Sequence, residues 1–88
     1  MSDIIPSTGR VLVKFSAEWC QPCKMLAKII ENDPPAIDIV GVDIDQHPEL
    51  AQSYGVRGVP TLIVFNNGKE EKRKVGMLTK EQLADFVK

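Results

Sequence analysis

The sequence predicts an α/β domain in which a four-stranded mixed sheet carries helices on both faces. Short stretches rich in β-branched residues alternate with stretches of helical periodicity, and strong turn signals separate them. The 88 residues, of which 43% are hydrophobic and 26% charged, suit one small hydrophobic core. We therefore expect a single domain over residues 1–88 in the order β-α-β-α-β-β-α, with residues 1–10 as an N-terminal extension.

The first half of the chain predicts a strand, a helix and a second strand. Residues 11–16 (VLVKFS) are rich in β-forming residues and predict a buried strand. A helix follows over residues 22–31, with Pro22 in its first turn, where a missing N–H costs nothing. The sequence NDPP at 32–35 ends this helix, and residues 37–43 predict the second strand. The apolar residues on one face of the helix are Met25, Leu26, Ile29 and Ile30.

The next segment predicts a short helix and a third strand. Asp45 is a candidate cap for the helix, Pro48 is tolerated in its first turn, and Gly55 is its C-terminal stop. The third strand covers residues 61–65 (TLIVF). The apolar residues of the short helix are Leu50, Ala51 and Tyr54.

The last segment predicts a hairpin and a final helix. Asn67 and Gly68, preceded by Asn66, suit a tight turn into a fourth strand over residues 70–75. The charges of this strand are typical of a solvated sheet edge. Thr79 and Gln82 have the spacing of a capping box. The helix that follows is expected to bury Leu83, Phe86 and Val87.

Composition excludes several classes of function. The formal net charge is -1 and the pI is about 5.7, so no excess of positive charge exists to neutralise nucleic-acid phosphates. No apolar run is long enough to span a bilayer, and the first ten residues lack the basic and apolar regions of a secretory signal. We expect a cytoplasmic protein that binds neither nucleic acid nor a membrane.

The only two cysteines, Cys20 and Cys23, stand in the segment SAEWCQPCKM. In a reducing compartment a Cys-x-x-Cys pair indicates redox chemistry or metal binding. The predicted helix begins here, and a helix N-terminus stabilises a thiolate. We expect Cys20 to attack a substrate disulfide and Cys23 to resolve the mixed disulfide, which leaves a redox-active Cys20–Cys23 disulfide.

The cysteine pair has two alternative interpretations. Half of a zinc site is one, but structural zinc uses four protein ligands, and the only histidine, His47, stands in a polar context. Inert packing cysteines are the other, although such a pair does not need Trp19 and Pro22 around it. We predict no metal and no cofactor. Trp19 is expected to be a half-exposed apolar platform for substrate, the alternative being an ordinary core tryptophan.

Three segments resemble the thioredoxin family. AEWCQPCKM resembles its active-site segment, VDIDQHPELAQSYGVRGVPTLIVFNNGK is similar to its central stretch, and KVGMLTKEQL to its final strand and helix. The resemblance covers residues from about 11 to 88 in order. It implies a thioredoxin-like fold, disulfide reductase activity on proteins, and a thioredoxin-reductase-type electron donor. The family's first strand and helix have little room in the ten residues before Val11.

The resemblance implies further site residues. Pro60 matches the family's cis-proline facing the disulfide, the alternative being a trans turn proline. The Val59 backbone would stay free to pair with an extended substrate segment. Substrate contact is implied for Trp19, Gln21, Pro22, Gly58, Val59, Pro60, Gly76 and Met77.

The chain also departs from the family pattern. Lys14 stands where the family has a buried aspartate beneath the second cysteine, and Gly41 stands where the lysine partner of that aspartate is common. A partly buried Lys14 can act as a neutral base toward Cys23 or as a cation that favours thiolates. Alternatively, its stem is buried and its ammonium group reaches water. Gln21 replaces the usual glycine, a change that can alter thiolate stability and partner choice.

The sequence therefore predicts a protein-disulfide reductase that cycles between dithiol and disulfide and carries electrons in redox homeostasis. We expect a monomer, with weak self-association left open by the trimmed N-terminus. The alternatives are a thioredoxin-like binding subunit with incidental redox activity, a glutaredoxin-like reductase, and an oxidant or isomerase of secreted proteins.

Overall fold

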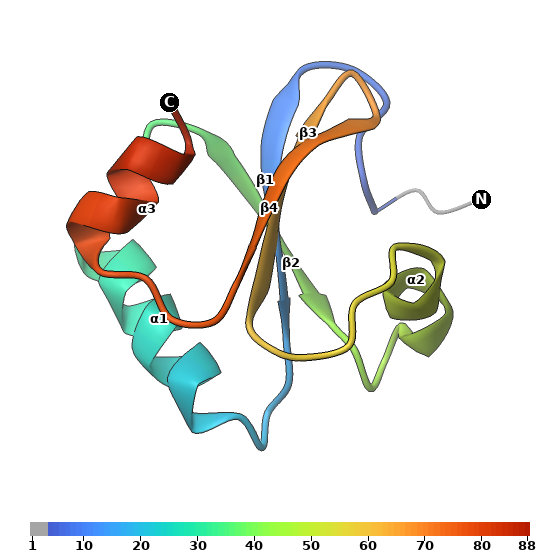
Figure 1. The fold of residues 1–88 in the computed structure, drawn as a ribbon, viewed down its shortest axis with the longest axis horizontal. Coiled ribbons are helices and arrows are strands. Elements are labelled where there is room, and N and C mark those ends of the chain that lie inside the picture. The colour runs from blue at the N-terminus through green and yellow to red at the C-terminus, as the bar shows by residue number, and fades with distance from the viewer. Residues whose placement is uncertain (1–3) are drawn as a thin grey trace.

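The computed structural model describes residues 4–88, which form the predicted succession of strands and helices (Figure 1). The elements are β1 (Arg10–Ser16), α1 (Gln21–Asn32), β2 (Asp38–Asp43), α2 (Pro48–Ser53), β3 (Thr61–Asn66), β4 (Lys69–Val75) and α3 (Lys80–Phe86). The predicted fold class is confirmed, and the observed boundaries of the four strands and of α1 lie within two residues of the predicted ones.

The four strands form one mixed sheet in the order β2-β1-β3-β4. β1 pairs in parallel with β2 and antiparallel with β3, and β3 pairs antiparallel with β4. Figure 1 shows α1 and α3 on one face of the sheet and α2 on the other. β1 and β3 are therefore the central strands, covered on both faces.

Successive residues of the central strands point into two separate cores. The core beneath α1 and α3 consists of Leu12, Leu26, Leu62, Val64, Leu78, Leu83 and Val87. The core beneath α2 consists of Val11, Val13, Phe15, Val42, Leu50, Ala51, Ile63 and Phe65. Burial on both faces explains why the central strands read as nearly continuous apolar runs. Lys14 interrupts these runs, because it is charged and stands in the middle of β1.

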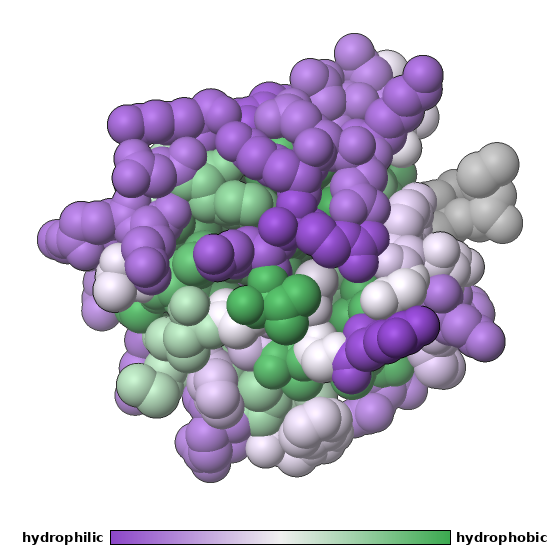
Figure 2. All heavy atoms as spheres, viewed as in Figure 1, coloured by the Kyte–Doolittle hydropathy of each residue, from purple (hydrophilic) through white to green (hydrophobic). Residues whose placement is uncertain are grey.

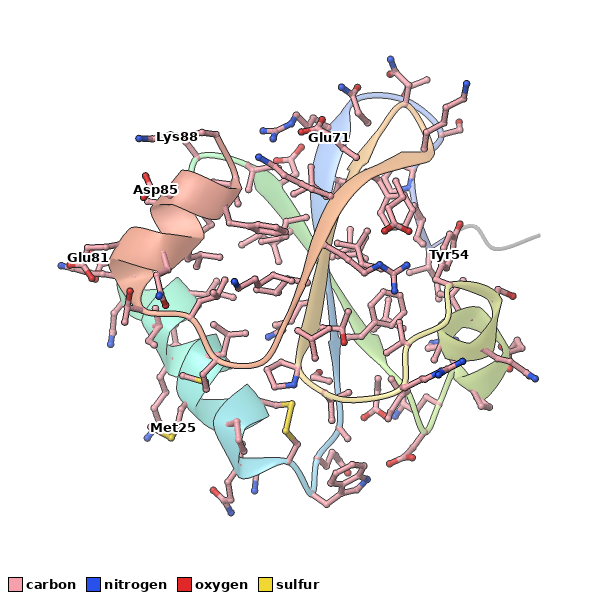
Figure 3. All side chains as sticks on the ribbon, viewed as in Figure 1. Met25, Tyr54, Glu71, Glu81, Asp85 and Lys88 are labelled. Carbon is pink, nitrogen blue, oxygen red and sulfur yellow. A yellow bond between two sulfur atoms is a disulfide. The ribbon has the colours of Figure 1, made fainter. Side chains whose placement is uncertain are left out.

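The apolar face predicted for α1 includes Met25, but Met25 does not face the sheet. Its side chain is 59% exposed and points away from the sheet, whereas Leu26 beside it is fully buried (Figure 3). The buried stripe of α1 runs through Cys23 and Leu26 toward Ile30. Consecutive helical residues lie about 100° apart around the axis, so Met25 falls outside this narrow stripe.

The predicted cap of the short helix is also wrong. The N-cap of α2 is His47, which makes no side-chain capping hydrogen bond, and the Asp45 carboxylate is used elsewhere. The other turn signals are confirmed. Asn67 and Gly68 adopt φ values of 53° and 81° in the β3–β4 turn, and both hydrogen bonds of the Thr79–Gln82 capping box are present.

Among residues 4–88, no helix combines the length and the apolar character that crossing a bilayer requires.

Candidate active site

The two cysteines lie where the chain passes from β1 into α1, at one end of the sheet. Cys20 is the N-cap of α1, with an extended backbone, and Cys23 is the third residue of the helix. Their Cα atoms are 5.3 Å apart and their sulfur atoms form a disulfide, drawn in yellow in Figure 3. Both residues are buried, together with Ala17. The predicted Cys20–Cys23 pairing is therefore present in the structure.

The Cys20 sulfur occupies the position of a helix-capping side chain. The Cys23 backbone N–H donates a hydrogen bond to Cys20 Sγ at 3.2 Å, which satisfies one of the free N–H groups of the first turn. The first turn of α1 carries no acidic residue, so no carboxylate competes for the positive end of the helix dipole. Both features favour the thiolate form of Cys20 once the disulfide is reduced.

The turn that precedes β3 lies against the disulfide. The Val59–Pro60 peptide bond is cis, as the resemblance implies, and the Val59 carbonyl oxygen lies 3.7 Å from Cys20 Sγ. Two hydrogen bonds hold this turn: Thr61 Oγ1 donates to the Gly58 carbonyl at 2.6 Å, and the Gly76 N–H donates to the Pro60 carbonyl at 2.9 Å. Within residues 4–88, the Val59 N–H has no hydrogen-bond partner.

Trp19 lies beside Cys20 and is 65% exposed, so it is not a core residue. Its indole Nε1–H donates to Asp45 Oδ2 at 2.9 Å, and the Asp45 N–H in turn donates to Asp43 Oδ1 at 2.8 Å. Asp45 thereby holds the indole toward the loop after β2. The sequence does not predict this role, because it contains no signal for a contact between residues 26 positions apart.

Further apolar side chains are exposed on the C-terminal side of β4. Val75 is 62% exposed and Met77 is 38% exposed, while Val59 is partly buried against the cysteines. Figure 2 shows apolar side chains at the surface of this face, below the hydrophilic side chains of the β3–β4 hairpin. Sequence analysis singled out Met77 and Val59 but missed Val75, which it assigned only to the edge strand.

Lys14 lies on the face of β1 that α1 covers, in register with Gly41 of β2 and Leu62 of β3. Its side chain is half-buried. Burial lowers the pKa of Lys14 below its ordinary value. Among residues 4–88, no hydrogen bond or ion pair reaches its ammonium group. A carboxylate counterion is therefore missing at the centre of this face.

A sulfur that caps a helix and a second sulfur one turn away suit the exchange of thiols with disulfides. The fold and the site thus define a thiol–disulfide oxidoreductase. The family model described as Thioredoxin matches residues 1–88. The thioredoxin of Chlamydia caviae is 48% identical over 84 residues, which cover 92% of this chain and 82% of the relative. That of Pseudomonas aeruginosa is 44% identical over 91 residues, covering 97% and 82%.

A solved structure agrees with these relatives. The N21Q mutant thioredoxin from Halobacterium salinarum NRC-1 superposes with a TM-score of 0.85 at 36% identity, covering 97% of this chain and 77% of that one. The chain belongs to the thioredoxin family. Members of this family exchange thiols with protein disulfides and are recharged by a reductase, and the chain is an oxidoreductase of this kind.

Proposed function

We propose that the protein is a general protein-disulfide reductase in which Cys20 is the nucleophile and Cys23 the resolving thiol. The observation that best supports this proposal is the hydrogen bond from the Cys23 N–H to Cys20 Sγ. This bond stabilises a thiolate at Cys20, and the second sulfur lies only one helical turn away. The Cys20 thiolate attacks one sulfur of a substrate disulfide. The bond between the two substrate sulfurs breaks, and the first substrate thiolate leaves.

The second exchange releases the product. Cys23 loses its proton, and its thiolate attacks Cys20 Sγ. The Cys20–Cys23 bond forms, the bond from Cys20 to the substrate breaks, and the second substrate thiolate leaves and takes a proton from water. Two electrons have then passed from the dithiol to the substrate. We propose a thioredoxin-reductase-type donor that returns two electrons to the disulfide.

Substrate recognition is proposed for the surface around the disulfide. The unpaired Val59 N–H supports strand-like pairing with an extended substrate segment. A Cβ added at Gly58 or Gly76 would meet no atom within 4 Å, so the surface at both glycines is open. The residues proposed to contact substrate are Trp19, Gln21, Pro22, Gly58, Val59, Pro60, Gly76 and Met77.

Turbidity from insulin reduction in dithiothreitol tests this proposal. The protein should accelerate the reaction over dithiothreitol alone. Cys20→Ser should abolish the acceleration, and Cys23→Ser should accumulate a mixed disulfide with the substrate, visible on a non-reducing gel. Ser53→Ala, an exposed change on α2, serves as the control. A folded wild-type sample that gives no acceleration would overturn the proposal.

We further propose that residues 1–88 act as one domain and as a cytoplasmic monomer, with residues 1–10 as an extension of the fold. The match of the family model to the whole of residues 1–88 supports the single unit. Size-exclusion chromatography with light scattering should give the mass of one 9.8 kDa chain. A mass that doubles with concentration would contradict the monomer.

A further inference from the structure

Lys14 is the charged residue that the middle of β1 directs into the face covered by α1. Arg10, at the start of β1, points to the same face but lies at its α3 end, where it donates to the Val87 carbonyl. Leu26 of α1 packs in one core with Leu12 and Leu62. Cys23 precedes Leu26 by one turn on the same buried stripe, about 5 Å along the helix. Lys14 follows Leu12 by two residues, about 7 Å along the strand on the same face.

The direction of α1 relative to β1 determines how Cys23 and Lys14 lie relative to each other. α1 begins beyond the C-terminal end of β1 and runs back over the sheet, as Figure 1 shows. One turn toward the start of α1 therefore corresponds to a step toward the end of β1. Leu26 shares its core with Leu12 and Leu62, so Cys23, one turn nearer the start of α1 on the same stripe, lies toward the part of β1 that carries Lys14.

The charges around this position are few. On β2, Gly41 offers no side chain. Asp43 lies two residues further along on the same face, paired with Ser16, and its Oδ1 accepts a hydrogen bond from the Asp45 N–H. On β3 the neighbour is the apolar Leu62, and across it β4 carries the exposed Lys74. The buried stripe of α1 holds no charged residue. Lys14 therefore has no anion of its own in the oxidised protein.

We propose that the Lys14 ammonium group is the charge that makes Cys23 reactive, by stabilising its thiolate during the resolving step. The inference rests on the proposed role of Cys23 as the resolving thiol. The Cys23 proton goes to water, and Lys14 stays protonated throughout. The Cys23 thiolate then attacks Cys20 Sγ, the Cys20–Cys23 bond forms, and the substrate sulfur leaves as a thiolate. The thiolate supplies the counterion that Lys14 lacks in the disulfide form, at a half-buried position where solvent screening is weak.

Direct titration of Cys23 tests the charge effect. In a Cys20→Ser background only Cys23 titrates, and thiolate absorbance at 240 nm gives its midpoint. Lys14→Met should raise the midpoint by about one pH unit, which lowers the thiolate fraction at neutral pH about tenfold. Lys14→Arg should keep it, because the charge is kept. Lys28→Met, an exposed change on the outer side of α1, is the matched control.

A midpoint in Lys14→Met equal to that of the Lys28→Met control would overturn the proposal, as would a lowered midpoint. The kinetic readout uses the intact Cys20–Cys23 pair. Decay of a preformed mixed disulfide at Cys20 should slow about threefold in Lys14→Met, because the more basic sulfur is a better nucleophile and offsets part of the lost thiolate, and it should slow more than the first attack does. Equal effects on both steps would also overturn the proposal. If the wild-type mixed disulfide does not decay through Cys23, the proposed function fails instead, while the titration still reports on Lys14.

Discussion

Trp19 is the largest side chain beside the disulfide, and one hydrogen bond fixes its orientation. The indole is mostly exposed, so packing alone does not hold it, and Asp45 supplies the acceptor from another loop. For the substrate contact that we propose for Trp19, such an anchor favours binding, because ordering a free indole during binding costs conformational entropy.

Asp45→Ala should therefore weaken substrate turnover while leaving the fold intact. Removing one acceptor from an exposed donor costs about 1 kcal/mol or less in stability. The expected result is a fall of a few-fold in kcat/KM for insulin reduction and lower fluorescence anisotropy of Trp19. Asp38→Ala, an exposed change at the far end of β2, is the control. Anisotropy equal to that of wild type would contradict the anchoring role.

Lys14 gives a second prediction, concerning stability against pH. Burial lowers its pKa in the folded protein, whereas the unfolded chain has the ordinary value of 10.5. Between these two values the unfolded state binds more protons, so stability rises with pH. The cost of the buried charge is therefore fully present below the folded pKa and is lost as pH rises toward 10.5.

Lys14→Met should consequently stabilise the oxidised protein at neutral pH, and this gain should shrink above the ordinary lysine pKa. Urea unfolding midpoints at the two pH values measure the effect. If the increase in stability is equal at both pH values, its cause is apolar packing and not the removed charge.

Single residues differ in how far sequence could predict them. The cysteine pair could be predicted, because a spacing of three residues at a helix start brings two sulfurs together whatever the rest of the fold does. The Trp19–Asp45 contact could not, because it joins two loops whose separation is set by the pairing of β1 with β2.

Among the elements, α3 begins with a capping box formed by two side chains. Thr79 accepts from the Gln82 N–H at 3.1 Å, and the Gln82 side chain accepts from the Thr79 N–H at 2.9 Å. Thr79→Ala should lower the free energy of unfolding by about 1 kcal/mol, because it leaves a helix N–H without its partner. Urea denaturation measures the change. Thr8→Ala, at an exposed threonine without a hydrogen-bond partner among residues 4–88, should be neutral. Equal effects of the two changes would contradict the capping role.

The elements themselves were largely predictable because local signals agree with the global fold. Apolar runs mark the central strands, and Asn67–Gly68 marks the hairpin. Met25 and Asp45 were predicted wrongly for a shared reason. Which face of α1 meets the sheet depends on how the helix crosses the sheet, and so does the residue at which α2 begins. The local sequence does not specify this crossing.

At the scale of the whole molecule, the β1–β3 register assembles the site. Antiparallel pairing brings the loop after β1 and the turn before β3 to the same end of the sheet, so Cys20 meets Val59 although 39 positions separate them. The same register directs Lys14 toward α1. A slip of one residue in this register would turn Lys14 toward α2, so the site depends on the correct register of the sheet.

The oxidised and reduced proteins should differ only modestly in stability. The disulfide joins residues three positions apart and closes a loop of four residues, for which the chain-entropy relation gives about 2 kcal/mol. Urea unfolding with and without dithiothreitol should show this loss with an unchanged m-value, since the buried surface is the same. A reduced protein that is unfolded, or that has a lower m-value, would contradict this prediction.

That small loop has a consequence for how partners tell the two forms apart. Because the bridge lies within one helical turn, we expect its reduction to leave the strands, both cores and the surrounding surface in place. A donor and an acceptor of electrons therefore encounter nearly the same outline. The direction of electron flow is then set by the reduction potentials of the protein and its partners, and not by recognition of shape.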